Sequence, residues 1–333
     1  MEVTASDSGR RIKTRKTEIG KGEELVDLKQ IEYILKIAEM KNVSQASKEL
    51  FISQSALNQQ LLKLEKELGA PLFFRDRNNW ELTPTGELYV KGAREILQIK
   101  KNTYNQIEDE LGTARRAFSL GLAAGRGIRM FASIYPQFME RCPQTSISPI
   151  EIGTYEQQEL IEAGRLDLGF LTIGPGKRAN LKYIHVCSED LLAALPEKHP
   201  LAMEAAAKGA GKYSELDLKL LKDENFVLMF PKSSCRAVTD QAFREAGFEP
   251  KILFETSSAA SVPSFVAAGI CCAIIPRYYA RDQKGIALFY LKSRPRWEMD
   301  FCYSRRSYLS RPLQTFIQMS GEYWRTYYGA DES

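Results

Sequence analysis

Three amide side chains between positions 54 and 59 have the chemistry needed to read a DNA base. Gln54, Asn58 and Gln59 each carry a hydrogen-bond donor and an acceptor on one planar group. Such a group can form two hydrogen bonds with the major-groove edge of adenine. Because any surface helix also carries polar side chains, composition alone leaves both a DNA contact and a solvated face open.

Two helix-start signals nine positions apart would position these amides. Ser44 and Ser53 are each followed by glutamine, and serine is a favoured N-cap residue. After Ser53 the leucines recur at helical spacing until Gly69, which is a typical helix terminator. A further helix is predicted over residues 27–40. The pattern therefore predicts a helix-turn-helix, with a support helix beginning at Ser44 and a reading helix beginning at Ser53.

The segment "PLFFRDRNNWELTPTG", residues 71–86, predicts a small β-wing next to the reading helix. It contains two short apolar stretches separated by a polar turn. Together with the helices it predicts a winged helix-turn-helix over residues 25–84. The candidate DNA-binding residues are Ser44, Ser53, Gln54, Ser55, Asn58, Gln59, Lys63, Arg75 and Arg77.

At these positions the sequence resembles the LysR-type transcriptional regulators. The resemblance rests on Ala46, Leu50, Ser53, Gln54, Ala56, Leu57, Leu64, Glu65, Leu68, Gly69, Leu72, Phe73, Arg75 and the run Leu82 to Gly86. The chain has Ser47, Ser55 and Asn78 where the family usually has alanine, proline and the wing arginine. Arg77 could replace that arginine one position early. The resemblance implies a double-stranded DNA operator, a small-molecule effector and RNA polymerase as partners.

Residues 85–112 carry apolar side chains at helical spacing without a proline, which predicts one long helix. Its apolar face could be core of the DNA-binding domain. The resemblance implies instead a linker helix that forms a homodimer or part of a homotetramer. Two copies would place two reading helices in successive major grooves.

Residues 117–328 alternate between strand and helix patterns, which predicts an α/β domain with open, mostly parallel sheets. The resemblance implies a two-lobed, periplasmic-binding-protein-like (type 2) effector domain. Lobe one would comprise 117–172 and 277–328, and lobe two 173–276, with crossings near Ile173 and Pro276. The Ala/Gly-rich segment 202–212 is predicted to be an exposed loop.

In such a domain, helix N-termini at the strand ends would collect in the cleft and favour an anion. The candidate effector-binding residues are Gly125, Arg126, Thr154, Tyr155, Lys232, Ser233, Ser234, Thr256 and Ser257. Ser233 and Ser234 could equally be helix caps, Arg126 a surface charge and Tyr155 a packing residue. For Arg126, a guanidinium among glycines at the cleft mouth suits a carboxylate.

Cys235 offers an alternative mechanism, a regulator that responds to thiol oxidation or peroxide. By resemblance it occupies the position of the reactive cysteine in peroxide-sensing members of the family. Its place at a helix start near Lys232 and Arg236 predicts a lowered thiol pKa. Because no second cysteine follows before Cys271, an anionic effector is the preferred interpretation.

Composition excludes several other classes. The net charge of only +4 neither demands nor excludes a nucleic-acid partner. Six cysteines without a C-x-x-C pair stand beside two histidines, so neither a metal site nor a cofactor is expected. No nucleophile elbow or phosphate loop indicates an enzyme. The longest apolar run, residues 265–276, is too short for a bilayer, and a polar N-terminus predicts a cytoplasmic protein. Residues 1–24 are predicted to be a disordered basic tail or an arm on DNA phosphates.

Overall fold

The computed structural model of this 333-residue chain describes residues 27–76, 79–112, 116–174, 178–209, 213–281 and 283–329. The chain divides into two compact units, Met1–Ala93 and Arg94–Ser333. The tail predicted for residues 1–24 lies outside the described residues, as do Arg77 and Asn78 of the wing.

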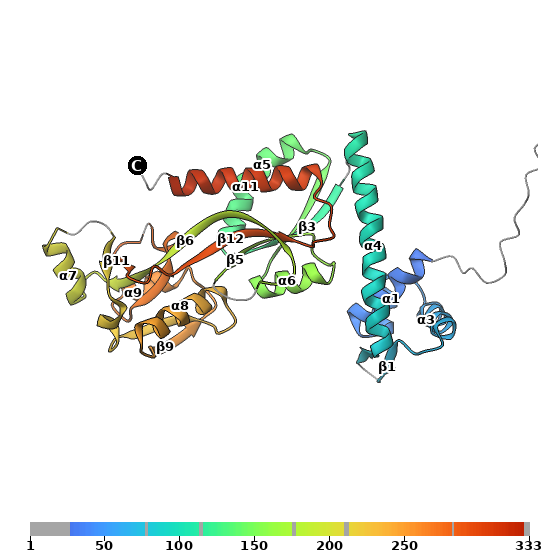
Figure 1. The fold of residues 1–333 in the computed structure, drawn as a ribbon, viewed down its shortest axis with the longest axis horizontal. Helices are drawn as coiled ribbons and strands as arrows, with labels where there is room; N and C mark the ends of the chain where they lie inside the picture. The colour runs from blue at the N-terminus through green and yellow to red at the C-terminus, as the bar shows by residue number, and fades with distance from the viewer. Residues whose placement is uncertain are drawn as a thin grey trace, which may run out of the picture. The chain divides into compact units, whose positions relative to one another are not determined.

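The first unit is a winged helix-turn-helix, as predicted. Its elements are α1 (Leu28–Met40), α2 (Val43–Glu49), α3 (Gln54–Leu68), β1 (Phe73–Arg75), β2 (Trp80–Leu82) and the start of α4 (Pro84–Leu111) (Figure 1). The two short strands pair antiparallel. Ile34, Ile37, Leu57 and Leu61 are fully buried and hold the three helices on one small core.

Of the two helix caps predicted from the sequence, one is confirmed and one is wrong. The Ser53 hydroxyl accepts a hydrogen bond from the N–H of Ala56 at 3.2 Å, so Ser53 caps α3 as predicted. The predicted cap at Ser44 is wrong. Asn42 caps α2 by accepting from the N–H of Gln45 at 3.0 Å, and Ser44 lies within the helix. Asparagine is as good a cap as serine, and Asn42 has the extended backbone that a cap requires.

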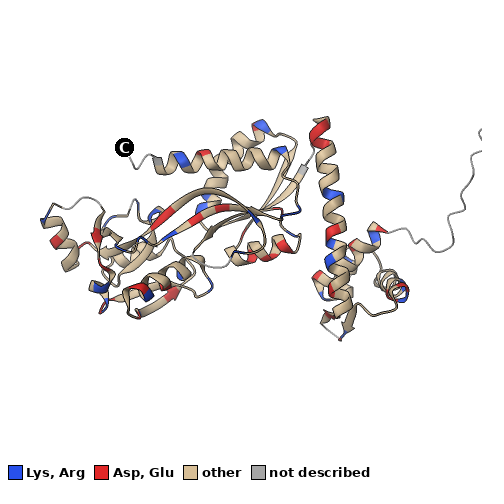
Figure 2. Ribbon diagram, viewed as in Figure 1, with Lys and Arg blue, Asp and Glu red and all other residues tan. Residues whose placement is uncertain are grey.

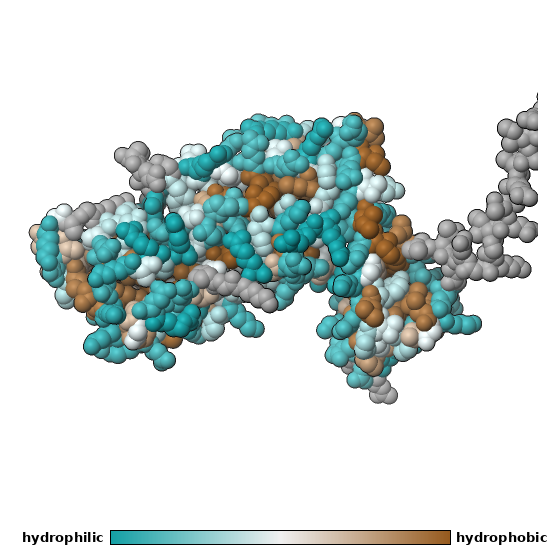
Figure 3. Space-filling view, in the orientation of Figure 1, coloured by the Kyte–Doolittle hydropathy of each residue, from teal (hydrophilic) through white to brown (hydrophobic). Residues whose placement is uncertain are grey.

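The long helix predicted over residues 85–112 is α4, which has 28 residues. Its start is fixed by Thr83, whose hydroxyl accepts from the N–H of Gly86 at 3.0 Å and donates to the carbonyl of Pro71 at 2.7 Å. Several large apolar side chains on α4 are more than half exposed, and brown atoms mark this helix in Figure 3. They are Leu88, Ile99, Tyr104, Ile107 and Leu111.

The second unit contains a sheet of eight strands in the order β4-β3-β5-β12-β6-β11-β7, with β10 also paired to β6. The strands are β3 (Arg116–Leu122), β4 (Thr145–Glu151), β5 (Leu168–Ile173), β6 (Lys182–Pro196), β7 (Ser214–Leu216), β10 (Ala273–Pro276), β11 (Ile286–Leu291) and β12 (Arg296–Tyr303). A separate parallel pair is formed by β8 (Asn225–Met229) and β9 (Lys251–Thr256).

The prediction of mostly parallel sheets is wrong, because the sheet is mixed. The first strands, β4, β3 and β5, pair in parallel. The late strand β12 returns between β5 and β6 and is antiparallel to both. An alternating strand–helix pattern shows the order of elements, but the direction of a returning strand depends on pairing between residues distant in sequence.

Helices cover both faces of the sheet (Figure 1). They are α5 (Arg126–Arg141), α6 (Thr154–Glu162), α7 (Pro200–Ala207), α8 (Ser234–Ala246), α9 (Val262–Ala267), α10 (Arg277–Ala280) and α11 (Arg311–Gly329), together with a short 3-10 helix at Leu218–Leu221. The exposed loop predicted for 202–212 is wrong in its first half, because residues up to Ala207 belong to α7. Consecutive alanines have the highest helix propensity, and His199 caps the helix.

Two apolar cores define two lobes. One gathers Phe138, Phe301 and Phe316, and the other gathers Phe226 and Phe243. The long strand β6 joins them: residues 182–190 pair with β12, and residues 191–196 pair with β10 and β11. The start of β6 therefore lies with lobe one and β11 with lobe two, a division that differs from the expected boundaries on both sides.

Within the described ranges, no helix is long and apolar enough to cross a membrane.

Candidate DNA-binding surface and effector site

The start of α3 presents the polar side chains that the sequence selected. Leu57, Leu61 and Leu64 point into the core. The opposite side exposes Gln54, Ser55, Gln59 and Lys63, with Asn58 partly exposed. The amides therefore lie on the outer side of the first turns, where a helix N-terminus also favours a phosphate.

Acidic and basic residues are interspersed over the described helices of the first unit (Figure 2). Lys63 has an acidic neighbour, Glu67, at 3.5 Å on the same helix. This distribution favours local contacts to DNA over a broad positive field.

Arg75 has a structural partner that the sequence did not reveal. Its guanidinium pairs with Glu65 of α3 and lies 5.5 Å from the ring centre of Trp80. The other carboxylate oxygen of Glu65 accepts from the N–H of Leu72 at 2.8 Å. This arrangement ties the wing to α3, so Arg75 holds the wing in place whether or not it also contacts DNA.

In the second unit, two predicted effector residues come together through a third that the sequence analysis missed. The hydroxyls of Thr172 and Ser234 lie 2.9 Å apart, which joins the end of β5 to the start of α8. Thr154 donates to the carbonyl of Thr172 at 3.0 Å. These three hydroxyls link lobe one to lobe two. The only signal for Thr172 was a polar residue near the end of the buried run "LDLGFLTI".

The remaining predicted residues around α8 and β9 have simpler roles. Ser233 is the N-cap of α8 and accepts from the N–H of Arg236 at 3.0 Å. Lys232 and Ser257 are exposed, and Thr256 accepts from the N–H of Ser258 at 3.1 Å. Of the two serines, Ser233 is a cap, and Ser234 has its hydroxyl on Thr172.

Arg126 does not lie at an open cleft mouth, and that expectation is wrong. It is 2% exposed, and its Nη1 pairs with the equally buried Glu189. The rings of Trp297, Tyr278 and Tyr279 lie 4.5, 5.3 and 5.2 Å from the guanidinium. Burial acts to lower the pKa of Arg126, but the charge and hydrogen bond of Glu189, together with Tyr279 and Tyr328, raise it overall.

Glu189 accepts hydrogen bonds from residues of α5, α10 and β12. Besides Arg126 of α5, the indole N–H of Trp297 donates at 2.7 Å and the N–H of Tyr278 at 2.6 Å. Because β6, β12 and the Pro276–Arg277 step are where the chain passes between lobes, this buried pair lies at the junction of the two lobes. Among the described residues, Nη2 of Arg126 is buried without a hydrogen-bond partner.

Gly125 is placed by the same corner. It precedes α5 with φ +69°, a backbone conformation that glycine adopts without strain. Its N–H donates to Glu151 at 2.8 Å, and the hydroxyl of Tyr279 donates to the carbonyl of Ala124 at 3.0 Å. The loop between β3 and α5 is therefore held on both sides.

Tyr155 does not belong with the three residues whose hydroxyls link the lobes, Thr154, Thr172 and Ser234. It is 49% exposed and lines a pocket of about 670 Å³ on lobe one, together with Gln158, Arg178 and Tyr183. The structure therefore brings Thr154 and Ser234 together and places Tyr155 apart from them.

Cys235 contradicts the predicted reactive thiolate. The side chain is buried, and burial raises its pKa to about 12, which exceeds the opposing effect of Arg126. A thiol with such a pKa is protonated at neutral pH and is a poor nucleophile. The helix N-terminus and nearby cations suggested a lowered pKa, but desolvation dominates.

A winged helix-turn-helix and a two-lobed α/β domain in one chain define a DNA-binding regulator with an effector-binding domain. Residues 28–87 match the family model described as bacterial regulatory helix-turn-helix protein, lysR family. Residues 112–325 match the LysR substrate binding domain. The chain therefore belongs to the LysR family of transcriptional regulators, which are not enzymes, and it acts on DNA under the control of a small molecule.

Individual relatives agree with this assignment. The chain is 25% identical to the uncharacterized HTH-type transcriptional regulator YcgK of Bacillus subtilis (strain 168), over 89% of this chain and 94% of that protein. Full-length OxyR from Pseudomonas aeruginosa has a similar fold, with a TM-score of 0.66 at 21% identity over 91% and 95% of the two chains. CbnR in complex with its target DNA gives a TM-score of 0.53 at 21% identity over 89% and 99%.

Proposed function

We propose that this regulator reads its operator with Gln54, Asn58 and Gln59 and binds a small anionic effector between its lobes. The observation that carries the effector assignment is the contact of Thr154, Thr172 and Ser234. Hydroxyls of two lobes within hydrogen-bond distance provide a polar site that closes when the lobes meet. The start of α8 favours negative charge by about 0.3–1 kcal/mol.

The remaining DNA-binding candidates have supporting roles in this proposal. Ser53 and Ser55 lie at the N-terminus of α3, where they and the backbone N–H groups would contact a phosphate. Ser44 and Lys63 would contact the DNA backbone from α2 and α3, and Arg75 would do so from the wing.

The exposed apolar face of α4 supports a homodimer, or a homotetramer built from dimers. Large apolar side chains with exposures of 53% to 74% on one helix are unusual for a protein that stays monomeric. We expect light scattering to give at least a dimer, and footprinting to give two half-sites about a helical turn, or a few turns, apart. A monomer that occupies the full operator would contradict this.

Promoter-bound regulators of transcription work on RNA polymerase, which we include as a proposed partner. Because the target is chromosomal DNA, the proposed place of action is the cytoplasm.

A thermal-shift screen of the full chain against small carboxylates, aromatic acids and amino acids tests the effector proposal. A ligand that binds only the folded state raises the melting temperature in a concentration-dependent way. The decisive variant is Ser234→Phe, which replaces the hydroxyl beside Thr172 with a bulky ring and should abolish both the shift and the effector's influence on operator binding.

Ser233→Ala is the matched control. Ser233 caps the same helix, but it is not one of the three residues Thr154, Thr172 and Ser234 that carry the proposal. It should lower stability by ~1 kcal/mol and leave the response to effector intact. A full response in Ser234→Phe would place the effector elsewhere, with the pocket beside Tyr155 as the next candidate.

A further inference from the structure

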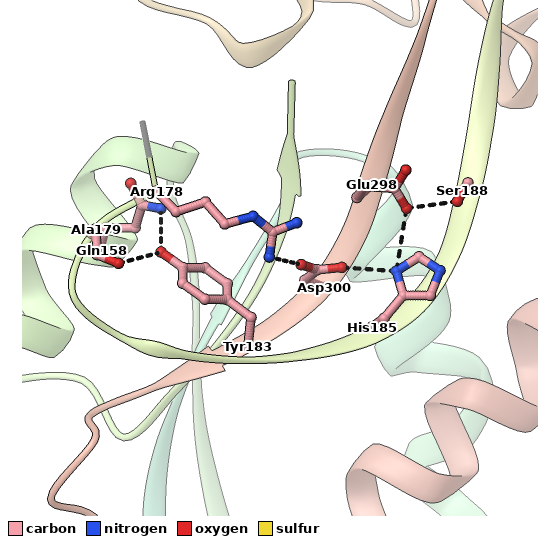
Figure 4. A network of polar contacts seen from close by, with 8 residues as sticks. All are labelled: Gln158, Arg178, Ala179, Tyr183, His185, Ser188, Glu298 and Asp300. Atoms are coloured by element: carbon pink, nitrogen blue, oxygen red, sulfur yellow. Dashed lines mark hydrogen bonds and ion pairs between the residues drawn. The ribbon is translucent and has the colours of Figure 1, made fainter. Parts of the chain in front are cut away.

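A histidine and two carboxylates lie together on one face of the lobe-one sheet (Figure 4). Nδ1 of His185 on β6 is 3.0 Å from Oδ1 of Asp300 and 3.2 Å from Oε2 of Glu298, both on β12. One donor atom from each side chain lies within 4.8 Å of the others. Neither operator reading nor the proposed effector site uses these residues.

An irregularity in the strand pairing creates this arrangement. Met299 pairs with Cys187, whereas Asp300 pairs with His185, so the register skips Val186. Side chains alternate along a strand, which puts Glu298 and Asp300 on one face. The bulge then brings His185 onto that same face, opposite Asp300.

Neighbouring groups orient both carboxylates. Arg178 donates to Oδ2 of Asp300 at 2.8 Å, which leaves Oδ1 directed at His185. Ser188 donates to Glu298 at 2.6 Å (Figure 4). Arg178 is itself held 4.8 Å from the ring centre of Tyr183. Such outer partners are what fixes metal-binding side chains in protein sites.

The charges of this group call for a further cation. Asp300 and Glu298 contribute two negative charges and Arg178 one positive charge, so a neutral His185 leaves a formal charge of −1. Asp300 is 1% exposed, and a buried carboxylate requires compensation. A metal ion bound by the three side chains can supply it.

The distances suit an ion. Two adjacent ligands at about 2.1 Å from an octahedral metal lie about 3.0 Å apart. The observed separations of 3.0 and 3.2 Å need little adjustment. His185 is 55% exposed at its side chain, which gives an ion a path from solvent. Nδ1 can bind a metal while Nε2 keeps its proton, so no tautomer conflict arises.

We infer that His185, Glu298 and Asp300 form a binding site for a divalent first-row transition metal ion, with water in the remaining positions. One imidazole and two carboxylates suit Zn²⁺, Mn²⁺, Co²⁺ or Ni²⁺ better than Mg²⁺, which prefers oxygen ligands alone. The inference does not depend on the proposed effector.

A second group of possible ligands among the described residues is less suited. His199, Glu224 and Cys272 also lie together. However, Nδ1 of His199 accepts from the N–H of Leu201 at 3.2 Å and caps α7, so Nε2 carries the proton in the neutral ring. A metal on Nε2 would require that proton to move to Nδ1, which would remove the cap.

Titration calorimetry with Zn²⁺ tests the inference on the full-length, metal-free protein without a histidine tag. The chain has only two histidines, which makes the comparison clean. We expect the parent to bind one Zn²⁺ per chain with saturation. His185→Ala should bind at least tenfold more weakly, and Glu298→Gln, which keeps the shape of the side chain, should lose a similar factor. Mg²⁺ should not compete.

His199→Asn is the matched control, since asparagine can still cap α7 and the site at His185 is untouched. It should bind Zn²⁺ as the parent does. Circular dichroism confirms that each variant is folded, and if His185→Ala is not folded then Glu298→Gln carries the comparison.

Co²⁺ provides a second readout, because a thiolate ligand gives an intense charge-transfer band that nitrogen and oxygen ligands do not. The inference predicts no such band. It is overturned if the parent shows no saturable Zn²⁺ binding, if His185→Ala and Glu298→Gln bind like the parent, or if a thiolate band appears and is lost in His199→Asn. All of these read metal binding directly, so they leave the assignment of operator and effector residues unaffected.

Discussion

Gly86 offers a sharp test of how the DNA-binding unit is assembled, because its replacement by alanine meets an immovable neighbour. A Cβ at Gly86 would lie 2.0 Å from the carbonyl oxygen of Leu72 and 3.1 Å from the side chain of Leu82. That carbonyl also accepts from the N–H of Thr83 at 3.0 Å, beside the cap of α4. The backbone must therefore move, and it cannot move without disturbing that bond.

The expected cost follows from these contacts. Overpacking a rigid site costs about 1–3 kcal/mol. Weakening the Thr83 hydrogen bond adds about 1 kcal/mol, while the better helix propensity of alanine returns about 1 kcal/mol. Gly92→Ala on the same helix is the matched control, since nothing lies within 4 Å of its added Cβ. The propensity gain is common to both variants, so their stabilities should differ by about 2–4 kcal/mol.

Hydrogen exchange on the full-length protein measures this difference where it arises. Protected amides of α1, α2 and α3 should exchange faster in Gly86→Ala and at the parent rate or more slowly in Gly92→Ala. Amides in the second unit serve as the internal reference. Equal protection of the first unit in both variants would refute the packing argument.

Three other variants test separate parts of the molecule. Gln59→Ala should weaken specific operator binding by ~1–3 kcal/mol per lost base contact, with little change in non-specific binding. If the footprints of Gln59→Ala, Gln54→Ala and Asn58→Ala are all unchanged, α3 is not the reading helix. Cys235→Ser should leave effector-dependent regulation largely intact, because burial raises the pKa of this thiol to about 12. Transcription assays of the parent and the variant, with and without mild peroxide, check this. A peroxide response that is present in the parent and lost in the variant would establish a redox sensor. Phe51→Asn should raise the free energy of unfolding of the first unit by ~0.5–1 kcal/mol. Phe51 is 94% exposed and has φ +54°, a backbone region that asparagine tolerates better than phenylalanine. Hydrogen exchange that shows no increase in amide protection would contradict this.

The sequence by itself determined the features that depend on near neighbours. The cap at Ser53, the apolar stripe of α3 and the paired wing strands are all encoded within a few residues. Even locally one prediction was wrong, because Asn42 and not Ser44 caps α2. Each of these elements forms through hydrogen bonds between residues that are close in sequence. The neighbouring residues are therefore sufficient to predict it.

Only the tertiary structure decided the features that depend on distant partners. Arg126 looked like a ligand-binding cation, yet Glu189 and three aromatic rings from other elements surround it where the lobes join. Cys235 had a sequence context that lowers a thiol pKa, and burial reverses the direction. The sequence around His185 did not indicate a site. The site exists because β12 pairs antiparallel with β6 and places two carboxylates beside His185. Pairing of this kind joins residues 63 positions apart at Arg126 and Glu189, and 115 positions apart at His185 and Asp300, so the neighbouring sequence does not reveal it.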